Sequence, residues 1–170
     1  MSNNDNDNEI SEEDKALFRK MVGEIRHVKS REYAKEKPDL NLPLNLTDIF
    51  SYKISAEEKL KFYRNPLTKR QNTAFIKGQL PIENSLDLHG LTIDEAKSAL
   101  LRFIHASFNR QKRSLLIIHG KGRRHGEAKL KNLVNHWLPQ FTEVLAFVSA
   151  EPKDGGAGAI YVLLKRNTFA

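Results

Sequence analysis

The second half of the sequence predicts an α/β fold of four strands and two helices, in the order β-α-β-α-β-β. Short apolar runs of strand length alternate with longer stretches whose apolar residues recur at helical spacing. The first helical stretch begins at a polar capping signal, and the last two apolar runs follow each other without a helix between them. Such alternation is typical of strands that are joined through helices packed on a shared sheet.

A strand, a helix and a second strand come first in the predicted domain. Residues 86–88 form a short strand, and residues 115–118 are continuously apolar, as in a buried strand. A capping box of Thr92 and Glu95 opens the helix between them. The inward face of this helix comprises Ala96, Ala99, Leu100, Phe103 and Ile104.

A second helix and two strands complete the predicted domain. The helix begins at about Glu127, and Pro139 marks its end. Strands follow at about residues 144–149 and 159–164, joined by the glycine-rich residues 152–158. The inward residues of the helix are Leu130, Leu133, Val134, Trp137 and Leu138.

Two segments precede the domain, which we place at residues 80–170. Residues 1–30 contain an acidic tip, which we expect to be disordered, and an amphipathic helix from Ser11. The apolar stripe of this helix packs either on the chain's own core or on a partner. Residues 31–79 are interpreted as a linker or extension whose prolines resist helix formation.

A short helix is expected within this extension. Ser55 and Glu58 form a capping box, and the helix should end before Pro66. Residues 65–80 are expected to be a loop.

The composition fits a cytoplasmic protein with one compact core. The chain has 170 residues, of which 39% are hydrophobic. It has no cysteine, which excludes disulfides and thiolate zinc sites. The N-terminus lacks the features of a signal peptide, and no apolar run is long enough to cross a bilayer, so we expect no membrane partner.

The charge favours a polyanionic partner. The formal net charge is +7, from 28 Lys and Arg against 21 acids. Eight of these bases and a single acid lie between Arg110 and Lys131, so the positive charge gathers around one loop. Surface lysines that keep the protein in solution are the alternative interpretation.

Two predicted strands end in His-Gly, at Leu88-His89-Gly90 and Ile118-His119-Gly120. A strand-helix-strand unit makes its strands parallel and brings both carboxyl ends to one edge of the sheet, where α/β proteins bind ligands. Alternation along the first strand places Asp87 and His89 on the same side, opposite the leucines. A carboxylate beside an imidazole suits acid–base chemistry, although a structural Asp and a capping His would give the same pattern.

The second strand end continues as His119-Gly120-Lys121-Gly122, followed by Arg123 and Arg124. Glycines allow close approach of the backbone, and the cations with the start of the next helix favour phosphate. A glycine turn with solvated cations is the alternative. The loop matches neither of the usual nucleotide-binding glycine motifs, which makes ATP or a dinucleotide an unexpected ligand.

The other histidines carry weaker signals. His105 and His136 lie within the predicted helices and are interpreted as surface or packing residues, whereas His125 is in the loop. A zinc site that combines histidines with Asp87 stays open, but no spacing matches a known ligand pattern.

At these residues the sequence resembles the Smr (small MutS-related) domain family, over about residues 80–166. Three motifs in this order carry the resemblance: Leu86-Asp-Leu-His-Gly90, His119-Gly-Lys-Gly122 and Gly155-Gly-Ala-Gly-Ala-Ile-Tyr-Val-Leu-Leu164. The acidic start and the helix from Ser11 also resemble the extension of stand-alone proteobacterial members.

The resemblance implies a two-layer sandwich with a mixed four-stranded sheet and two helices, similar to the C-terminal domain of translation initiation factor three. It also implies endonuclease activity, since family members include enzymes that nick DNA and others that cut RNA, one branch at collided ribosomes. The family's Asp-x-His maps onto Asp87 and His89, and its His-Gly-x-Gly maps onto residues 119–122.

The first hypothesis is therefore an RNA endonuclease. His89 or His119 would take the proton of a ribose 2′-hydroxyl, the other would protonate the leaving oxygen, and Asp87 would orient His89. Phosphate would be held by Lys121, Arg123, Arg124 and the N–H groups of Gly120 and Gly122. No cofactor is required, although a Mg²⁺-dependent version with Asp87 as a ligand stays open.

Two alternatives use the same residues differently. The first is DNA nicking by a metal-activated water. The second is a non-catalytic adaptor that binds ribosomal RNA through the basic loop and a protein through the helix from Ser11. For either activity, the ribosome is a candidate partner of that helix.

Overall fold

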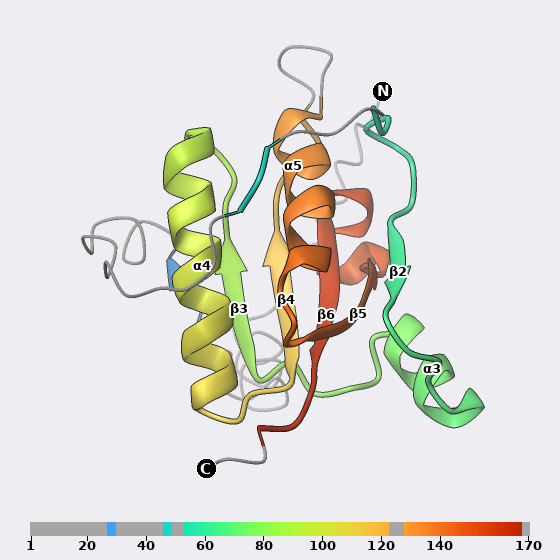
Figure 1. Cartoon of the computed structure of the whole chain (residues 1–170). Coiled ribbons are helices and arrows are strands. Elements are labelled where there is room, and N and C mark those ends of the chain that lie inside the picture. The colour runs from blue at the N-terminus through green and yellow to red at the C-terminus, as the bar shows by residue number, and fades with distance from the viewer. Residues whose placement is uncertain (1–26, 30–45, 49–52, 123–127, 168–170) are drawn as a thin grey trace, which may run out of the picture.

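The structure is a computed structural model that describes residues 27–29, 46–48, 53–122 and 128–167 (Figure 1). Six strands form one sheet in the order β1-β3-β4-β6-β5-β2. The four inner strands are those that the sequence predicts, which confirms the α/β class. Their bounds are Asn84–Asp87 for β3, Ser114–Ile118 for β4, Ala159–Leu164 for β6 and Val144–Ser149 for β5.

The strand directions bring three loops to one edge of the sheet. β3 and β4 are parallel, with Asp87 opposite Ile118. β6 is antiparallel to both β4 and β5, so β5 points the same way as β3 and β4. The ends of these three strands and the glycine-rich residues 152–158 therefore share one edge, at the top of Figure 1. We call it the carboxyl edge.

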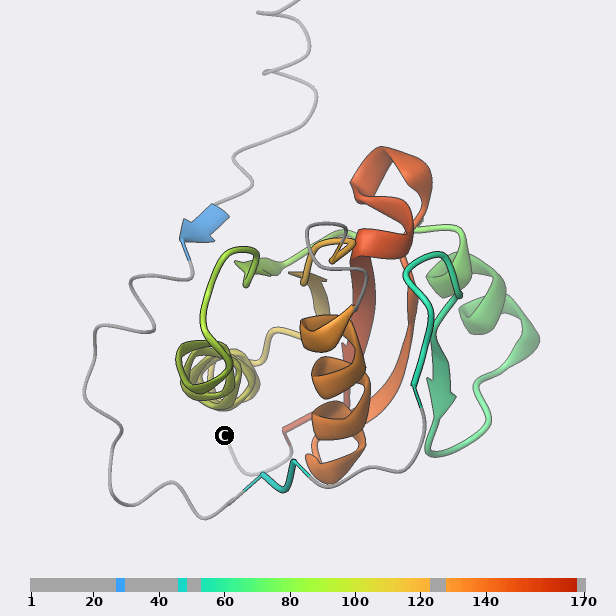
Figure 2. The ribbon, with the colours of Figure 1, turned by 90° about the horizontal axis from the view of Figure 1, so that it is seen from above.

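Helices α4 (Ile93–Asn109) and α5 (Lys129–Trp137) cover one face of the sheet (Figure 2). The predicted capping box of α4 is confirmed, because Thr92 accepts from the Glu95 N–H and Glu95 accepts from the Thr92 N–H. α5 ends two residues before Pro139, as predicted. The main core between helices and sheet includes Leu86, Leu88, Leu100, Phe103, Ile117, Val134, Trp137 and Val162.

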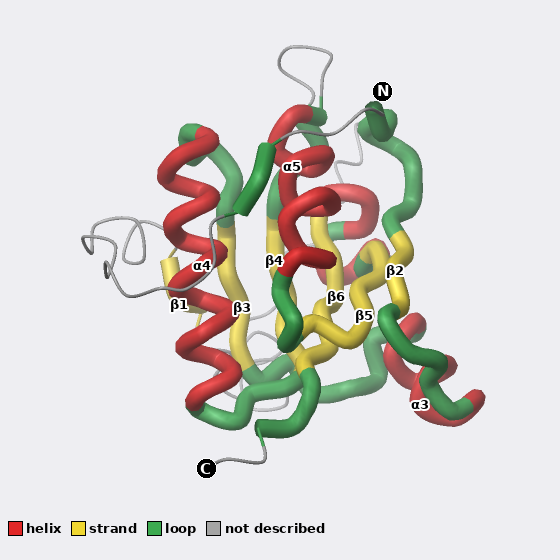
Figure 3. The backbone as a smooth tube through the Cα atoms, in the orientation of Figure 1, coloured by secondary structure: helices red, strands yellow, loops and turns green. Residues whose placement is uncertain are grey.

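A third helix, α3 (Lys69–Ile76), lies at the lower right of Figure 3 and packs on part of the opposite face. Phe75 of α3 is 1% exposed and packs in a second core with Leu116, Val148 and Tyr161. The prediction of a loop over residues 65–80 is therefore wrong. The family resemblance implied a two-layer sandwich, and α3 adds a partial third layer to it. The local signal was a capping box of Thr68 and Gln71, which the structure shows.

Two short edge strands extend the predicted four-stranded sheet. β1 (His27–Lys29) pairs parallel with β3, and β2 (Lys61–Tyr63) pairs antiparallel with β5. Phe62 stacks on Phe147 with ring centroids 5.3 Å apart, which seats β2 against the core. The predicted extension at residues 31–79 thus contributes β2 and α3 to the folded domain.

The helix predicted from Ser55 is wrong, because this stretch forms a turn that leads into β2. The side chain of Lys131, on α5, donates to the main-chain oxygens of Ser55, Ala56 and Glu58. In a helix the carbonyls point along the common axis, so three carbonyls that converge on one ammonium group are not in helical geometry. A long-range contact thus overrides the local capping signal.

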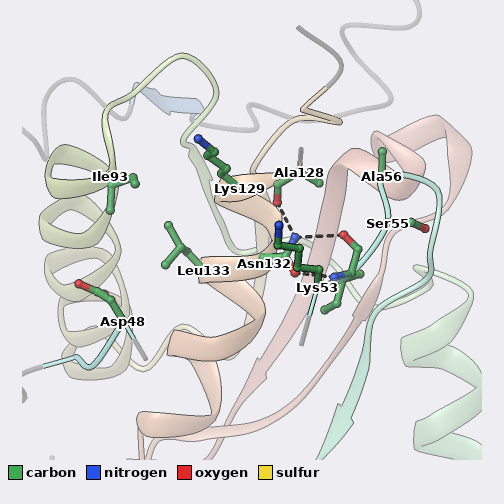
Figure 4. Close-up of a pocket in the computed structure, with 10 residues that line it drawn as sticks. Asp48, Lys53, Ser55, Ala56, Ile93, Ala128, Lys129, Asn132 and Leu133 are labelled. Atoms are coloured by element: carbon green, nitrogen blue, oxygen red, sulfur yellow. Dashed lines mark hydrogen bonds between the residues drawn. The ribbon is translucent and has the colours of Figure 1, made fainter. Parts of the chain in front are cut away.

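Asn132, the neighbour of Lys131, holds the same segment (Figure 4). Its amide accepts from the Ile54 N–H at 2.6 Å and donates to the Ile54 and Ala128 oxygens. A cavity of about 710 Å³ lies beside these contacts, and Ile93 and Leu133 are among its lining residues.

The acidic tip and most of the helix predicted from Ser11 lie outside the described residues, but the predicted helix extended to Val28, which lies in the strand β1. Within the part of the chain that is described, no helix has both the length and the apolar character that a membrane span requires. The expected likeness to translation initiation factor three stays a prediction.

Candidate active site

The end of β3 presents an exposed imidazole held by a carboxylate. Leu86 and Leu88 are fully buried, whereas Asp87 and His89 face the other way, with side chains 34% and 71% exposed. The Nδ1 atom of His89 lies 2.6 Å from Oδ1 of Asp87, which also accepts the His89 main-chain N–H at 3.0 Å. Since Nδ1 donates to the carboxylate, Nε2 is the nitrogen that remains for a ligand.

The end of β4 forms a tight turn beside this pair. The N–H groups of His119 and Gly120 both donate to the Gly158 oxygen, at 3.0 and 2.9 Å. Gly120 has φ +76°, and a Cβ added to it would lie 3.6 Å from Cβ of His89. The positive φ favours glycine at this position, and the 3.6 Å distance, an ordinary van der Waals contact, shows that the turn lies beside His89. The structure thus brings together the two strand ends that the sequence singles out.

His119 itself is in a different environment from His89. It is 4% exposed, and its Nδ1 lies 2.8 Å from the Gly120 oxygen. Burial lowers the pKa of His119 to about 4, and the charge of Lys131 adds to the lowering. No hydrogen bond among the described residues links it to Asp87 or His89. A neutral, buried imidazole is suited to holding the turn in place. It is less suited to the proton transfer that the sequence predicts for His119.

The predicted phosphate cradle is only partly described. Lys121 and Gly122 are exposed, and their main-chain N–H groups have no hydrogen-bond partner within the described residues. The Gly120 N–H, predicted as a phosphate donor, is instead taken by Gly158. Arg123 and Arg124 lie outside the described residues.

Lys121 extends along the carboxyl edge from His89 toward β6. A Cβ added to Gly158 would lie 3.2 Å from Cγ of Lys121, so the lysine stem lies across this glycine. The order along the edge is therefore the Asp87–His89 pair, the Gly120 turn and then Lys121.

A buried tyrosine, which sequence reasoning missed, holds the loop that carries Gly158. The Tyr161 hydroxyl donates to Oδ2 of Asp154 and accepts from the Glu151 N–H at 3.3 Å. Burial, with the Asp154 carboxylate, raises the pKa of Tyr161. The only sequence signal is a tyrosine in an apolar strand, which does not reveal a partner on the preceding loop.

No group of three or more histidine or acidic side chains that could hold a metal ion is found in the described part of the chain. Of the site residues predicted from the sequence, Asp87 alone carries a carboxylate. A metal ion at the site would therefore contact Asp87 and take its other ligands from the substrate and water. His105 packs edge-on against Phe141 and lies 3.5 Å from Glu143, in line with the packing role expected from sequence.

These features define an α/β domain whose candidate site lies at the carboxyl ends of parallel strands. The Smr domain family model matches residues 86–165, and the chain belongs to this family.

Relatives and a solved structure extend over more of the chain. "Ribosome rescue factor SmrB" of Tolumonas auensis is 27% identical, with 94% of this chain and 97% of that protein covered. "Probable DNA endonuclease SmrA" of Escherichia coli is 30% identical, with 93% and 91% covered. The crystal structure of YdaL, a stand-alone small MutS-related protein from Escherichia coli, matches at a TM-score of 0.66 and 32% identity, with 75% of this chain and 98% of that chain covered.

Proposed function

We propose that this protein is an endonuclease that cleaves RNA, with Asp87 and His89 as its catalytic pair. The observation that carries the proposal is the exposed His89 ring, which Asp87 orients beside a glycine turn and a lysine. Two full-length relatives support the reaction class and the setting, since one is named a probable DNA endonuclease and the other a ribosome rescue factor.

His89 acts as the general base. Its Nε2 takes the proton of a ribose 2′-hydroxyl, and the 2′-oxygen attacks the adjacent phosphorus. The bond to the 5′-oxygen breaks, and that oxygen takes a proton from water. Asp87 fixes the ring and stabilises the imidazolium that forms, as an Asp does beside other catalytic histidines.

The turn that follows β4 stabilises the reacting phosphate. Lys121 and the N–H groups of Lys121 and Gly122 are the described donors for the charge that grows on the phosphate oxygens. His119 keeps the turn in place through Gly120. It is a positioning residue in this scheme.

The chemistry of the cut ends tests this mechanism. RNA cleaved by the purified full-length protein should carry 5′-hydroxyl ends and a cyclic 2′,3′-phosphate, and cleavage should persist in EDTA. Ends that carry only 5′-phosphate would reject the mechanism.

DNA nicking is a second candidate, favoured by the relative named a probable DNA endonuclease. It would use a metal-activated water, with Asp87 as a metal ligand. Nicking of supercoiled plasmid that requires Mg²⁺, together with no cleavage of structured RNA, would favour it over the first.

A further inference from the structure

A groove of about 700 Å³ lies next to the candidate site, on the face of the sheet that α3 partly covers. Its lining includes Lys121, which thus belongs both to the groove and to the candidate site. Val148 and Ala150, at the end of β5, form its largely buried floor, and Ile76 of α3, which is 37% exposed, provides its apolar surface. The volume is in the range of ordinary ligand pockets, roughly 300–1,000 Å³.

Two lysines from the segment around β2 lie along the groove opposite Lys121. Lys61 is paired with Val148, and Leu60 between the lysines is buried in the main core. Alternation along a strand therefore directs Lys59 and Lys61 toward the groove. The Leu60 N–H donates to Oγ of Ser149 at 2.8 Å, and the Leu60 oxygen accepts from the Ser149 N–H, which fixes this segment at the carboxyl edge.

The glycine-rich loop leaves the backbone open to the groove. Gly156 has φ +57°, and a Cβ added there would meet no atom within 4 Å. A sugar-phosphate chain can therefore approach the main chain closely at this point. Glu57 and Glu151 also line the groove and can accept from ribose hydroxyls.

We propose that this groove binds a single strand of RNA next to the scissile bond, with phosphates at Lys59, Lys61 and Lys121 and bases on the apolar surface. The proposal rests on the proposed function, because the strand must run from His89 past Gly120 and Lys121 to reach the groove. Unpaired bases are required, since bases stacked within a duplex cannot lie against the exposed side chain of Ile76.

The test is RNA binding by the full-length chain carrying His89→Ala, so that the RNA is not cut. The affinity for a labelled single-stranded RNA is measured by fluorescence anisotropy. It is compared between this chain and the same chain that also carries Lys59→Ala together with Lys61→Ala. Affinity should fall about tenfold, and the slope of log affinity against log salt should flatten by about 0.7 for each phosphate that no longer meets a lysine.

Arg110→Ala with Lys112→Ala is the matched control, because it removes two exposed cations next to the start of β4, at the opposite edge. It should change affinity less than twofold. Equal binding by the groove and control variants, both folded by circular dichroism, would overturn the proposal.

The outcome is separable from that of the nuclease proposal, because binding is measured on an inactive chain. If binding depends on Lys59 and Lys61 but the unmutated protein cuts no RNA, the proposal of RNA binding in the groove stands and the nuclease proposal is rejected. Cleavage at full rate by the Lys59→Ala and Lys61→Ala variant on limiting RNA would reject the groove and keep the nuclease.

Discussion

His89 and His119 follow corresponding strand ends, yet burial gives them different chemistry. His89 is exposed and held by a carboxylate, whereas His119 is buried and donates to a main-chain oxygen. The sequence indicates both residues because each precedes a glycine at a strand end. It cannot indicate which ring is exposed, because that depends on how the turn packs on Gly158 and α5.

His119 should make stability depend on pH. Unfolding returns its pKa from about 4 to 6.5, so the unfolded chain binds the proton first as the pH falls. The stabilisation is complete above pH 6.5 and is lost as the pH drops to about 4. The loss is up to roughly 3 kcal/mol.

Urea unfolding across this pH range measures the effect. His119→Asn keeps an N–H donor for the Gly120 oxygen but does not titrate, so its unfolding free energy should depend less on pH. An unchanged pH dependence in His119→Asn would contradict the account of this residue.

Elements with strong local patterns were predictable from the sequence, and those that depend on distant partners were not. α4 has a capping box and a continuous apolar face, and β4, β5 and β6 are short apolar runs, whereas β3 is marked by the alternation around Leu86 and Leu88. β2 has only three residues and forms because its backbone can pair with the free edge of β5. α3 buries a single residue, Phe75, so its helical pattern is weak.

The link from Tyr161 to the turn of the candidate site, at His119 and Gly120, can be tested with a matched pair of tyrosine variants. Tyr161→Phe removes the donor to Asp154, and Tyr63→Phe removes a donor to Asn72 far from the turn. Each should lower stability by about 1 kcal/mol. Only Tyr161→Phe should lower kcat, because the loop it holds carries the Gly158 oxygen.

Amide hydrogen exchange separates this positioning role from a general loss of stability. The N–H groups of His119 and Gly120 should exchange faster in Tyr161→Phe than in Tyr63→Phe, because both donate to Gly158. Equal exchange and equal kcat in the two variants would remove Tyr161 from the account.

At the scale of the whole molecule, Lys131 joins the extension to the domain. Its ammonium group is buried and donates to three main-chain oxygens of the turn before β2. Desolvation lowers the pKa of Lys131, while Glu58 and Glu57 oppose the lowering. The sequence shows Lys131 as one cation of a basic cluster, which conceals its structural role.

Lys131→Met should lower the unfolding free energy by about 3 kcal/mol, because three oxygens lose a charged donor. Residues 54–63 should lose protection from hydrogen exchange before α4 does. Lys129→Met, at an exposed position of the same helix, is the control and should have little effect. Similar stabilities of the two variants would contradict this role of Lys131.

Chemical rescue of His89→Ala tests the central claim most directly. Single-turnover cleavage of RNA by this variant should fall by a factor of about 10² or more. Because the ring is largely exposed, added imidazole can occupy its place and should restore part of the rate. Cleavage by His89→Ala at the wild-type rate, without imidazole, would contradict the assignment of His89 as the group that takes the proton.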